Sequence, residues 1–348
     1  STHRVLIGAE FGRQDTQNFR QTGYFGASNS TVSSVWVDIN NPQPTQPVYF
    51  RQSASDADNS GVADIAALYL QDQWHLGEHW QIIAGLRYDR FAMDFSNRRN
   101  GTRITTQDTQ WSPRAGVIYQ PSDALSFYAS YSESFVPRSG DQLASLTPSN
   151  ASLKPEQFVN KEVGMKWQLS QGIFSTLAVY ELDRNRVAVS DPQNPGLSLL
   201  LDAQRSRGVE WELSAKISPQ LQLLAGYAYQ EAEITKALSA SIPAGTVLAN
   251  VPEHSAYFWG RWDFNTRWAV GLGANAQSGM YASTSNSVWL PGYLRMDAAL
   301  FYTQSENLHW QFNVENIIDR RYFGSAHNDN NIAIGTPREA KLSLHIGF

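Results

Sequence analysis

The sequence predicts an all-β protein, a transmembrane antiparallel β-barrel with 14 long strands. Three observations favour this fold. Apolar and polar residues alternate through most of the chain, which is the period of a β-strand with two unlike faces. The alternating segments are long enough to cross a bilayer, for which about 9 to 11 tilted residues suffice. Short turns and long loops also alternate strictly along the chain.

The alternation is clearest in six segments. In each, the residues of one parity are mainly apolar and those of the other parity are mainly polar. The segments are 5–11, 80–89, 162–169, 209–217, 308–315 and 341–348. The apolar face is expected to meet lipid, and the polar face the lumen. The lumen-facing charges by this parity are Arg87, Asp89, Glu162, Lys166, Glu210, Glu212, Arg295, Asp297 and Glu315.

The connections predict hairpins with short turns at one end and long loops at the other. Short connections fall near 77–79, 121–123, 170–172, 218–219, 265–266 and 305–306. Long ones fall near 16–60, 97–106, 137–154, 190–198, 234–251, 281–290 and 323–335. Outer-membrane barrels have short periplasmic turns and longer external loops. A soluble sandwich has shorter strands, and the repeat of a propeller is not found.

Composition agrees with a membrane barrel. Of 348 residues, 17% are charged and 12% aromatic, against about 25% charged in soluble domains. The net charge of −5 argues against nucleic acid as a partner. There is no cysteine, and no apolar run of the roughly 18 residues that a transmembrane helix needs. The start, "STHRVLIGAEFG", is already strand-like, so the chain is expected to begin inside a larger structure.

Several stretches resemble the TonB-dependent outer-membrane siderophore receptors. They are "YASYSESFVPRSG" (128–140), "SLKPEQFVNKEVGMKW" (152–167), "DAQRSRGVEWEL" (202–213), "NVPEHSAYFWGRWDF" (250–264), "VENIIDRRYF" (314–323) and "GTPREAKLSLHIGF" (335–348). Within this family, "SAHNDNNIAIGTPR" (325–338) and "LLDAQRSRGVE" (200–210) are most similar to catecholate-siderophore receptors.

The resemblance implies a larger barrel than the one visible here. Such receptors have about 22 strands around a plugged lumen. We therefore expect residues 1–348 to be the C-terminal portion of the barrel, with the plug domain and the first strands missing. The alternative is a self-contained barrel of 14 strands that acts as a passive channel in the outer membrane of a Gram-negative bacterium.

The resemblance implies uptake of a ferric siderophore, with energy from TonB and its inner-membrane partners. The catecholate-like stretches imply that this siderophore is a catecholate. The iron(III)–siderophore complex would be the ligand, and no covalently bound cofactor or catalytic residue is expected. The alternative ligands are haem and vitamin B12. The alternative class of protein is a membrane barrel that does not transport, such as an adhesin or an enzyme. Lipopolysaccharide is an expected neighbour. The terminal Phe348 resembles the signal that the barrel-assembly machinery reads.

Ligand contacts are expected from Arg and aromatic side chains in the loops. Ferric catecholates are anionic and flat, which suits guanidinium groups and aromatic rings. The candidates are Arg138, Arg98, Arg99, Arg103, Tyr281, Trp289, Arg321, Tyr322 and His327. No metal-binding motif is found: "DADNSG" (56–61) resembles half of an EF-hand loop, but Ala67 stands where Glu is needed.

Overall fold

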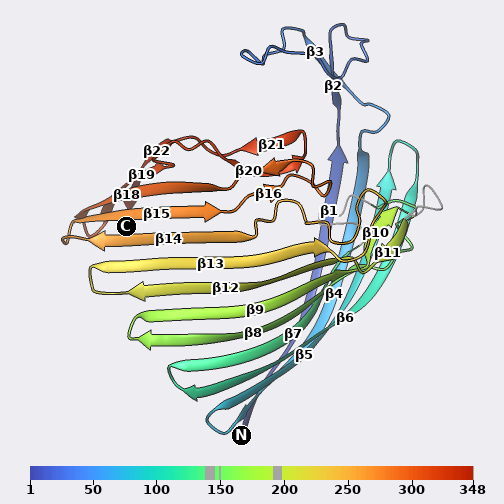
Figure 1. Ribbon diagram of the computed structural model, residues 1–348. Helices are drawn as coiled ribbons and strands as arrows, with labels where there is room; N and C mark the ends of the chain where they lie inside the picture. Colours follow the sequence, from blue (N-terminus) through green and yellow to red (C-terminus); the bar gives the residue numbers. More distant parts are fainter. Residues whose placement is uncertain (138–145, 149, 191–197, 348) are drawn as a thin grey trace.

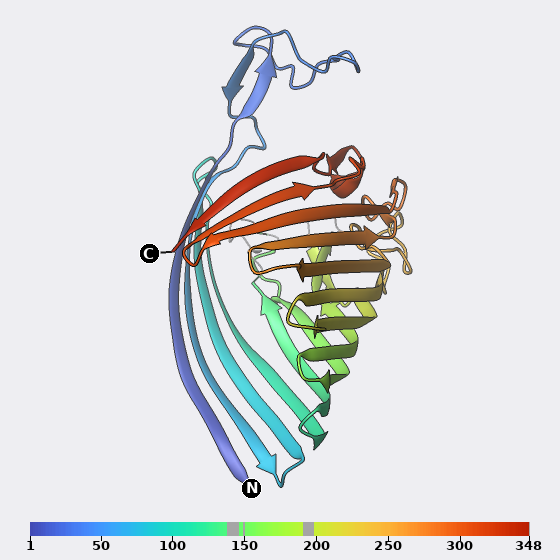
Figure 2. The same cartoon turned by 90° about the vertical axis from the view of Figure 1, so that its left-hand side faces the viewer.

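The computed structural model describes residues 1–137, 146–148, 150–190 and 198–347. Fourteen strands form one curved antiparallel sheet, in which each pairs with the sheet strands before and after it in the chain, and the other described strands form separate hairpins (Figures 1 and 2). Strand number and order confirm the predicted fold. The described residues contain no helix that is long and apolar enough to cross a membrane.

The sheet consists of β1 (Thr2–Phe19), β4 (Asp58–Leu76), β5 (Trp80–Asn97), β6 (Arg103–Ser122), β7 (Leu125–Val136), β8 (Glu156–Ser170), β9 (Ile173–Asn185), β12 (Gln204–Lys216), β13 (Leu221–Ile234), β14 (His254–Asp263), β15 (Trp268–Gln277), β18 (Tyr293–Ser305), β19 (Leu308–Glu315) and β22 (Glu339–Ile346).

Six short turns lie at one end of these strands and seven longer connections at the other, as predicted. Four of the long connections carry hairpins that the sequence did not predict. They are β2 (Thr22–Phe25) with β3 (Val48–Arg51), β10 (Val187–Ser190) with β11 (Ser198–Leu201), β16 (Met280–Tyr281) with β17 (Trp289–Leu290), and β20 (Phe323–Asn328) with β21 (Asn331–Ile334). The β2–β3 hairpin stands clear of the sheet in Figures 1 and 2.

One predicted loop begins earlier than expected. The sequence predicts a long connection near 323–335, but β19 already ends at Glu315. Asn316 follows with φ of +50°, and Asp319 also has a positive φ. Left-handed residues cannot continue a strand, and Asn tolerates this conformation. The loop therefore begins at residue 316.

Strand register confirms the two predicted faces. Val163 lies opposite Val179, Val179 opposite Val209, and Val209 opposite Tyr229, so the apolar parity is continuous across four strands. The apolar side chains are well exposed; Val163 and Val179 are 61% and 53% accessible. They splay apart on the outer, convex face of the curved sheet, where lipid would cover them.

Aromatic side chains mark both borders of the apolar band. Near the short turns, Trp80 packs on Tyr119 with ring centroids 4.5 Å apart, and Trp268 packs on Tyr302 at 4.4 Å. Nearer the long loops, Tyr88 packs on its cross-strand partner Trp111 at 4.7 Å. Such girdles are typical of the two membrane–water interfaces of a barrel.

Rings lie over glycines on the inner, concave face. Tyr257 crosses Gly226 so closely that a Cβ there would be 2.2 Å from the ring. The other Tyr–Gly pairs on this face are Tyr69 with Gly8, Tyr128 with Gly164 and Tyr180 with Gly208. Each ring fills the space above a glycine, which has no side chain of its own to pack there.

The sheet has two open edges. β1 pairs with β4 and β22 pairs with β19, and these strands stand at opposite ends of the strand order. A closed barrel of 14 strands would require β1 to pair with β22. These two strands do not pair in the structure.

Candidate functional site

Charged residues on the inner face form ion pairs beneath the long loops. The Arg87 guanidinium donates to Asp89 at 2.9 Å and to Glu10 of β1 at 2.9 Å. On another part of the wall, Arg295 pairs with Asp297 at 2.8 Å. The inner wall thus has the polar character that was predicted for a lumen.

A pocket of about 420 Å³ opens where β6 and β7 separate. The two strands pair from Ser122 only as far as Arg114, opposite Ser132. Pro113 comes next, and proline has no N–H to donate to a ladder. Beyond this point β6 stays with β5 while β7 stays with β8. The pocket occupies the space between them.

Part of the connection between β7 and β8 folds against the inner face. Leu146 is 3% exposed and packs with Ala63, Met93 and Phe95, which lie on β4 and β5. Ala151 packs on the same cluster. Burial of these apolar side chains draws the connection against the wall.

The charge of the β6–β7 pocket does not suit an anionic ligand. Its lining includes four carboxylates and one guanidinium, namely Glu10, Asp89, Asp108, Glu133 and Arg87. An anionic metal chelate would meet a net negative surface there. Ligand contacts are therefore better sought among the cations of the loops.

Three long loops form one packed unit, which we call the three-loop unit: residues 235–253, 278–292 and 316–338. Met280, Ala282 and Leu290 of the second loop form a buried cluster with Ala326 of the third. Ser285 also donates to Asp329 at 2.8 Å across these two loops.

Asn250 joins the first loop to the other two. Its side chain donates to the Ala326 carbonyl at 2.8 Å and accepts from the Ala326 N–H at 2.7 Å. Its backbone N–H donates to the Tyr281 carbonyl at 2.9 Å. Asn250 adopts φ of +58°, a conformation that Asn tolerates. The residue begins one of the stretches quoted above, but no pattern in the sequence indicates this role.

Two predicted arginines hold the loop between β1 and β4. Arg98 pairs with Asp58 at 2.8 Å. Arg99 donates to the carbonyls of Ser53 and Asp56, the latter at 3.0 Å. In this structure both guanidinium groups support a loop.

Asp56 is the buried anchor of the same loop. Its carboxylate accepts from the Ser53 N–H at 2.7 Å, from Arg20 at 2.8 Å and from Thr22 at 2.8 Å. These bonds, the backbone bond from Ser53 first, hold the pKa of the Asp56 carboxyl well below its usual range. Asp56 and Asp58 thus use their carboxylates within the protein. The described residues contain no cluster of three or more potential metal ligands.

Several other predicted ligand contacts are exposed to solvent. Arg103 and Arg321 are exposed, and within the described ranges neither side chain has a hydrogen bond or ion pair. His327 of β20 is exposed. Trp289 is 55% exposed and packs edge-on against Tyr281, with ring centroids 4.9 Å apart.

Tyr322 is 7% exposed, and its ring packs on Tyr293 at 4.3 Å and against Gly335. The Tyr322 ring is therefore enclosed between β18 and Gly335. Arg138 and Phe348 lie outside the described residues. The other candidates therefore fall into two groups: Arg98, Arg99 and Arg103 at the connection between β5 and β6, and Tyr281, Trp289, Arg321, Tyr322 and His327 on the three-loop unit.

Residues 3–317 match the family model described as TonB dependent receptor-like, beta-barrel. The chain belongs to this family. Its members are receptors of the outer membrane, which agrees with the predicted location and with the prediction that the chain is not an enzyme.

TonB-dependent receptors are also the chain's relatives by sequence and structure. The metal-pseudopaline receptor CntO of Pseudomonas aeruginosa is 31% identical over 361 aligned residues, covering 99% of this chain and 49% of that receptor. The catecholate siderophore receptor Fiu of Escherichia coli K12 is 25% identical, covering 99% and 49%. The crystal structure of the siderophore receptor PiuA from Acinetobacter baumannii superposes with a TM-score of 0.85 at 22% identity, covering 99% and 53%. The chain thus spans about half the length of these relatives.

Proposed function

We propose that the protein takes up a metal–siderophore complex across the outer membrane, with TonB and its inner-membrane partners supplying the energy. The family match over residues 3–317 carries the proposal. It is supported by exposed, unpaired arginines at the long-loop end, which suit an anionic chelate. Residues 1–348 would be the C-terminal part of the barrel, and the plug and TonB-contacting segment would belong to the rest of the protein.

For the ligand, we propose a ferric catecholate. Support comes from the stretches at 200–210 and 325–338, and from the relationship to a receptor named for catecholate siderophores. A second candidate is a metal–pseudopaline complex, because a 31% identical relative is named as its receptor.

Growth under iron limitation tests the transport proposal. The complete coding sequence is expressed in a Gram-negative host that lacks its own siderophore receptors, with a ferric catecholate as the only iron source. We expect growth that depends on both the protein and TonB. Growth without TonB would contradict the proposal and indicate passive passage. Uptake of labelled metal–pseudopaline, haem and vitamin B12 by the same cells, measured in parallel with the ferric catecholate, decides the ligand.

Binding by purified variants tests the ligand contacts. Arg103→Ala and Arg321→Ala should each weaken ferric-siderophore binding several-fold with the barrel still folded, because each removes an unpaired cation. Arg138→Ala is tested for the same prediction. Arg99→Ala is the matched control, since its guanidinium already holds loop carbonyls. Unchanged affinity in all three test variants would remove these arginines from the site.

A further inference from the structure

The turn between β5 and β6 contains an asparagine followed directly by a glycine. Asn100–Gly101 is the only such pair in the sequence. Both residues are exposed, and Gly101 has φ of +74° with open space where a Cβ would stand. The backbone nitrogen after an asparagine can attack the asparagine side chain when no neighbouring side chain hinders it, and glycine gives the freest access. The pair is therefore a candidate for covalent rearrangement.

The Asn100 side chain is folded back over the following peptide. Its Oδ1 accepts a hydrogen bond from the Thr102 N–H at 3.0 Å, which is the geometry of an Asx-turn. This bond polarises the amide carbonyl, and the same N–H can stabilise the oxyanion that forms when a nucleophile adds to it. Within the described residues, Nδ2 of Asn100 makes no hydrogen bond. The amide nitrogen is therefore unhindered as a leaving group.

The Gly101 nitrogen is the nucleophile, and its N–H donates to the Asn97 carbonyl at 3.0 Å. That bond has to open before the nitrogen can attack, so the folded turn should react more slowly than a free peptide. Arg98, Arg99 and Arg103 lie within three residues of the pair. Their positive charge favours loss of the proton from the peptide nitrogen, because nearby cations stabilise an anion.

We propose that Asn100 is a site of deamidation by way of a cyclic imide. The Gly101 nitrogen loses its proton to hydroxide and bonds to Cγ of Asn100, and Nδ2 takes a proton from water and leaves as ammonia. Water then opens the imide at either of its two carbonyls and leaves aspartate or isoaspartate. The sum consumes one water and releases one ammonia, and nothing is oxidised or reduced.

The modification changes the charge of the turn. Residues 98–103 hold three arginines and no carboxylate, so the new carboxylate lowers their formal charge from +3 to +2. Arg103 is one of the exposed cations that we propose to meet the anionic chelate. This consequence rests on the proposed function. If that function holds, the modified protein should bind a ferric siderophore several-fold more weakly, because the new anion repels the ligand.

Peptide mapping by mass spectrometry tests the modification without any ligand. Protein purified from the complete coding sequence is kept at mildly alkaline pH and sampled over time. A synthetic peptide of residues 97–103 is treated in parallel and gives the rate of the unfolded sequence. We expect the fragment that contains Asn100 to gain the mass difference between NH2 and OH, in both the aspartate and the isoaspartate form.

Asn29 is the internal control. It is also exposed, and the N–H of the residue after it, Ser30, also donates to a carbonyl, that of Ala27 at 2.9 Å. Because serine follows it, Asn29 should convert at least tenfold more slowly than Asn100. Gly101→Ala should slow conversion of Asn100 by a similar factor, with folding checked by gel mobility. Unmodified Asn100 after the free peptide has fully converted would overturn the proposal, and so would equal rates at Asn29 and Asn100.

The effect on binding is measured separately with a ferric catecholate. Asn100→Asp should bind it several-fold more weakly than wild type. Asn100→Gln, which keeps the charge of the turn, should bind like wild type. Equal affinity of Asn100→Asp and wild type would overturn the effect on binding. If wild type itself does not bind the chelate, the proposed function fails, whereas the mass-spectrometric result still decides whether Asn100 deamidates.

Discussion

Replacement of Asn316 by Ala should loosen the loop between β19 and β22 while leaving the sheet intact. Asn316 is fully buried. Its side chain donates to the carbonyls of Arg320 and Thr336 at 2.9 and 3.0 Å, and accepts from the Arg320 N–H at 2.8 Å. These bonds close the start of the loop onto its end.

The magnitude follows from the three bonds and the backbone angle. Each hydrogen bond contributes about 0.5–1.5 kcal/mol net, so their loss costs about 1.5–4.5 kcal/mol. The φ of +50° costs about 1 kcal/mol more with Ala. Asn316→Gly removes the bonds but tolerates the angle, so its free energy of local unfolding should exceed that of the Ala variant by about 1 kcal/mol.

Hydrogen–deuterium exchange measures this directly in the purified protein. A loss of about 3 kcal/mol in local stability speeds exchange by roughly a hundredfold, and the change should fall on peptides from residues 317–338. Asn313→Ala is the control, because Asn313 accepts only one side-chain bond, from Gln311 at 2.9 Å. Unchanged exchange in 317–338 for both Asn316 variants would refute the reasoning, as would an equal change across β12 and β13.

Three further predictions concern packing, pH and loop coupling. Gly208→Ala should sharply reduce the folded fraction seen by gel mobility, because its Cβ would meet a backbone oxygen at 2.2 Å; Gly324→Ala, in open space, should fold normally. The hydrogen bonds to the ionised Asp56 carboxylate lower its pKa and stabilise the β1–β4 loop. This stabilisation is complete above the pKa of an unfolded Asp, about 3.9, and is lost as the pH falls toward the lower pKa of the folded state. Proteolysis of the loop should therefore rise in acid for wild type, whereas Asp56→Asn should be cleaved at neutral pH with little pH dependence; identical cleavage profiles would contradict this. Asn250→Ala should raise exchange in all three loops of the three-loop unit, and a response confined to residues 235–253 would show that Asn250 does not couple them.

Much of the fold could be predicted because its signal is local. The alternation in segments such as 209–217 assigns each side chain to a face without knowledge of any partner strand, since successive residues of a strand point to opposite sides. The turn-and-loop order then determined which strands are neighbours. The start of the loop after β19 was missed because it depends on the left-handed backbone of Asn316 and Asp319, which no period in the sequence marks.

The candidate site depended on contacts that local patterns cannot show. Arg99 is predicted to meet ligand from its residue type alone, and the sequence does not show that it donates to a carbonyl 46 residues away. Asn250 bonds to Ala326 over 76 residues, and Tyr322 is buried against Tyr293 by the folding of the loop. Loop side chains obey no fixed period, so their partners emerge only when the loops pack.

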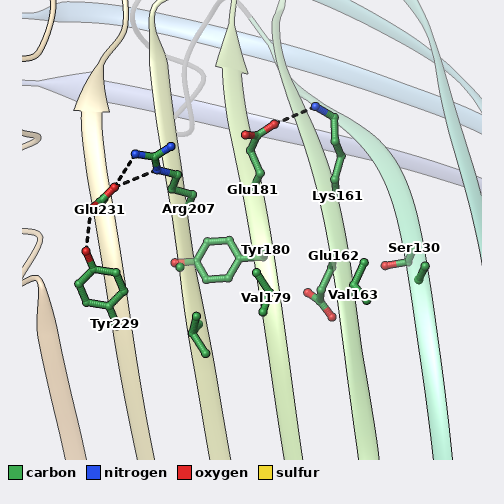
Figure 3. A pocket seen from close by; sticks show the side chains of 13 residues that line it. Ser130, Lys161, Glu162, Val163, Val179, Tyr180, Glu181, Arg207, Tyr229 and Glu231 are labelled. Atoms are coloured by element: carbon green, nitrogen blue, oxygen red, sulfur yellow. Dashed lines mark hydrogen bonds and ion pairs between the residues drawn. The ribbon is translucent and has the colours of Figure 1, made fainter.

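The strands, their two faces and the family could be read from the amino-acid order, because alternation and short characteristic stretches are local properties of the chain. Which loop side chains are exposed and which bond to other parts of the protein depends on how the loops pack. Likewise, Val163, Val179, Val209 and Tyr229 form one row only in the folded sheet (Figure 3). Four residues on four strands become neighbours because backbone hydrogen bonds fix the register of each strand against the next.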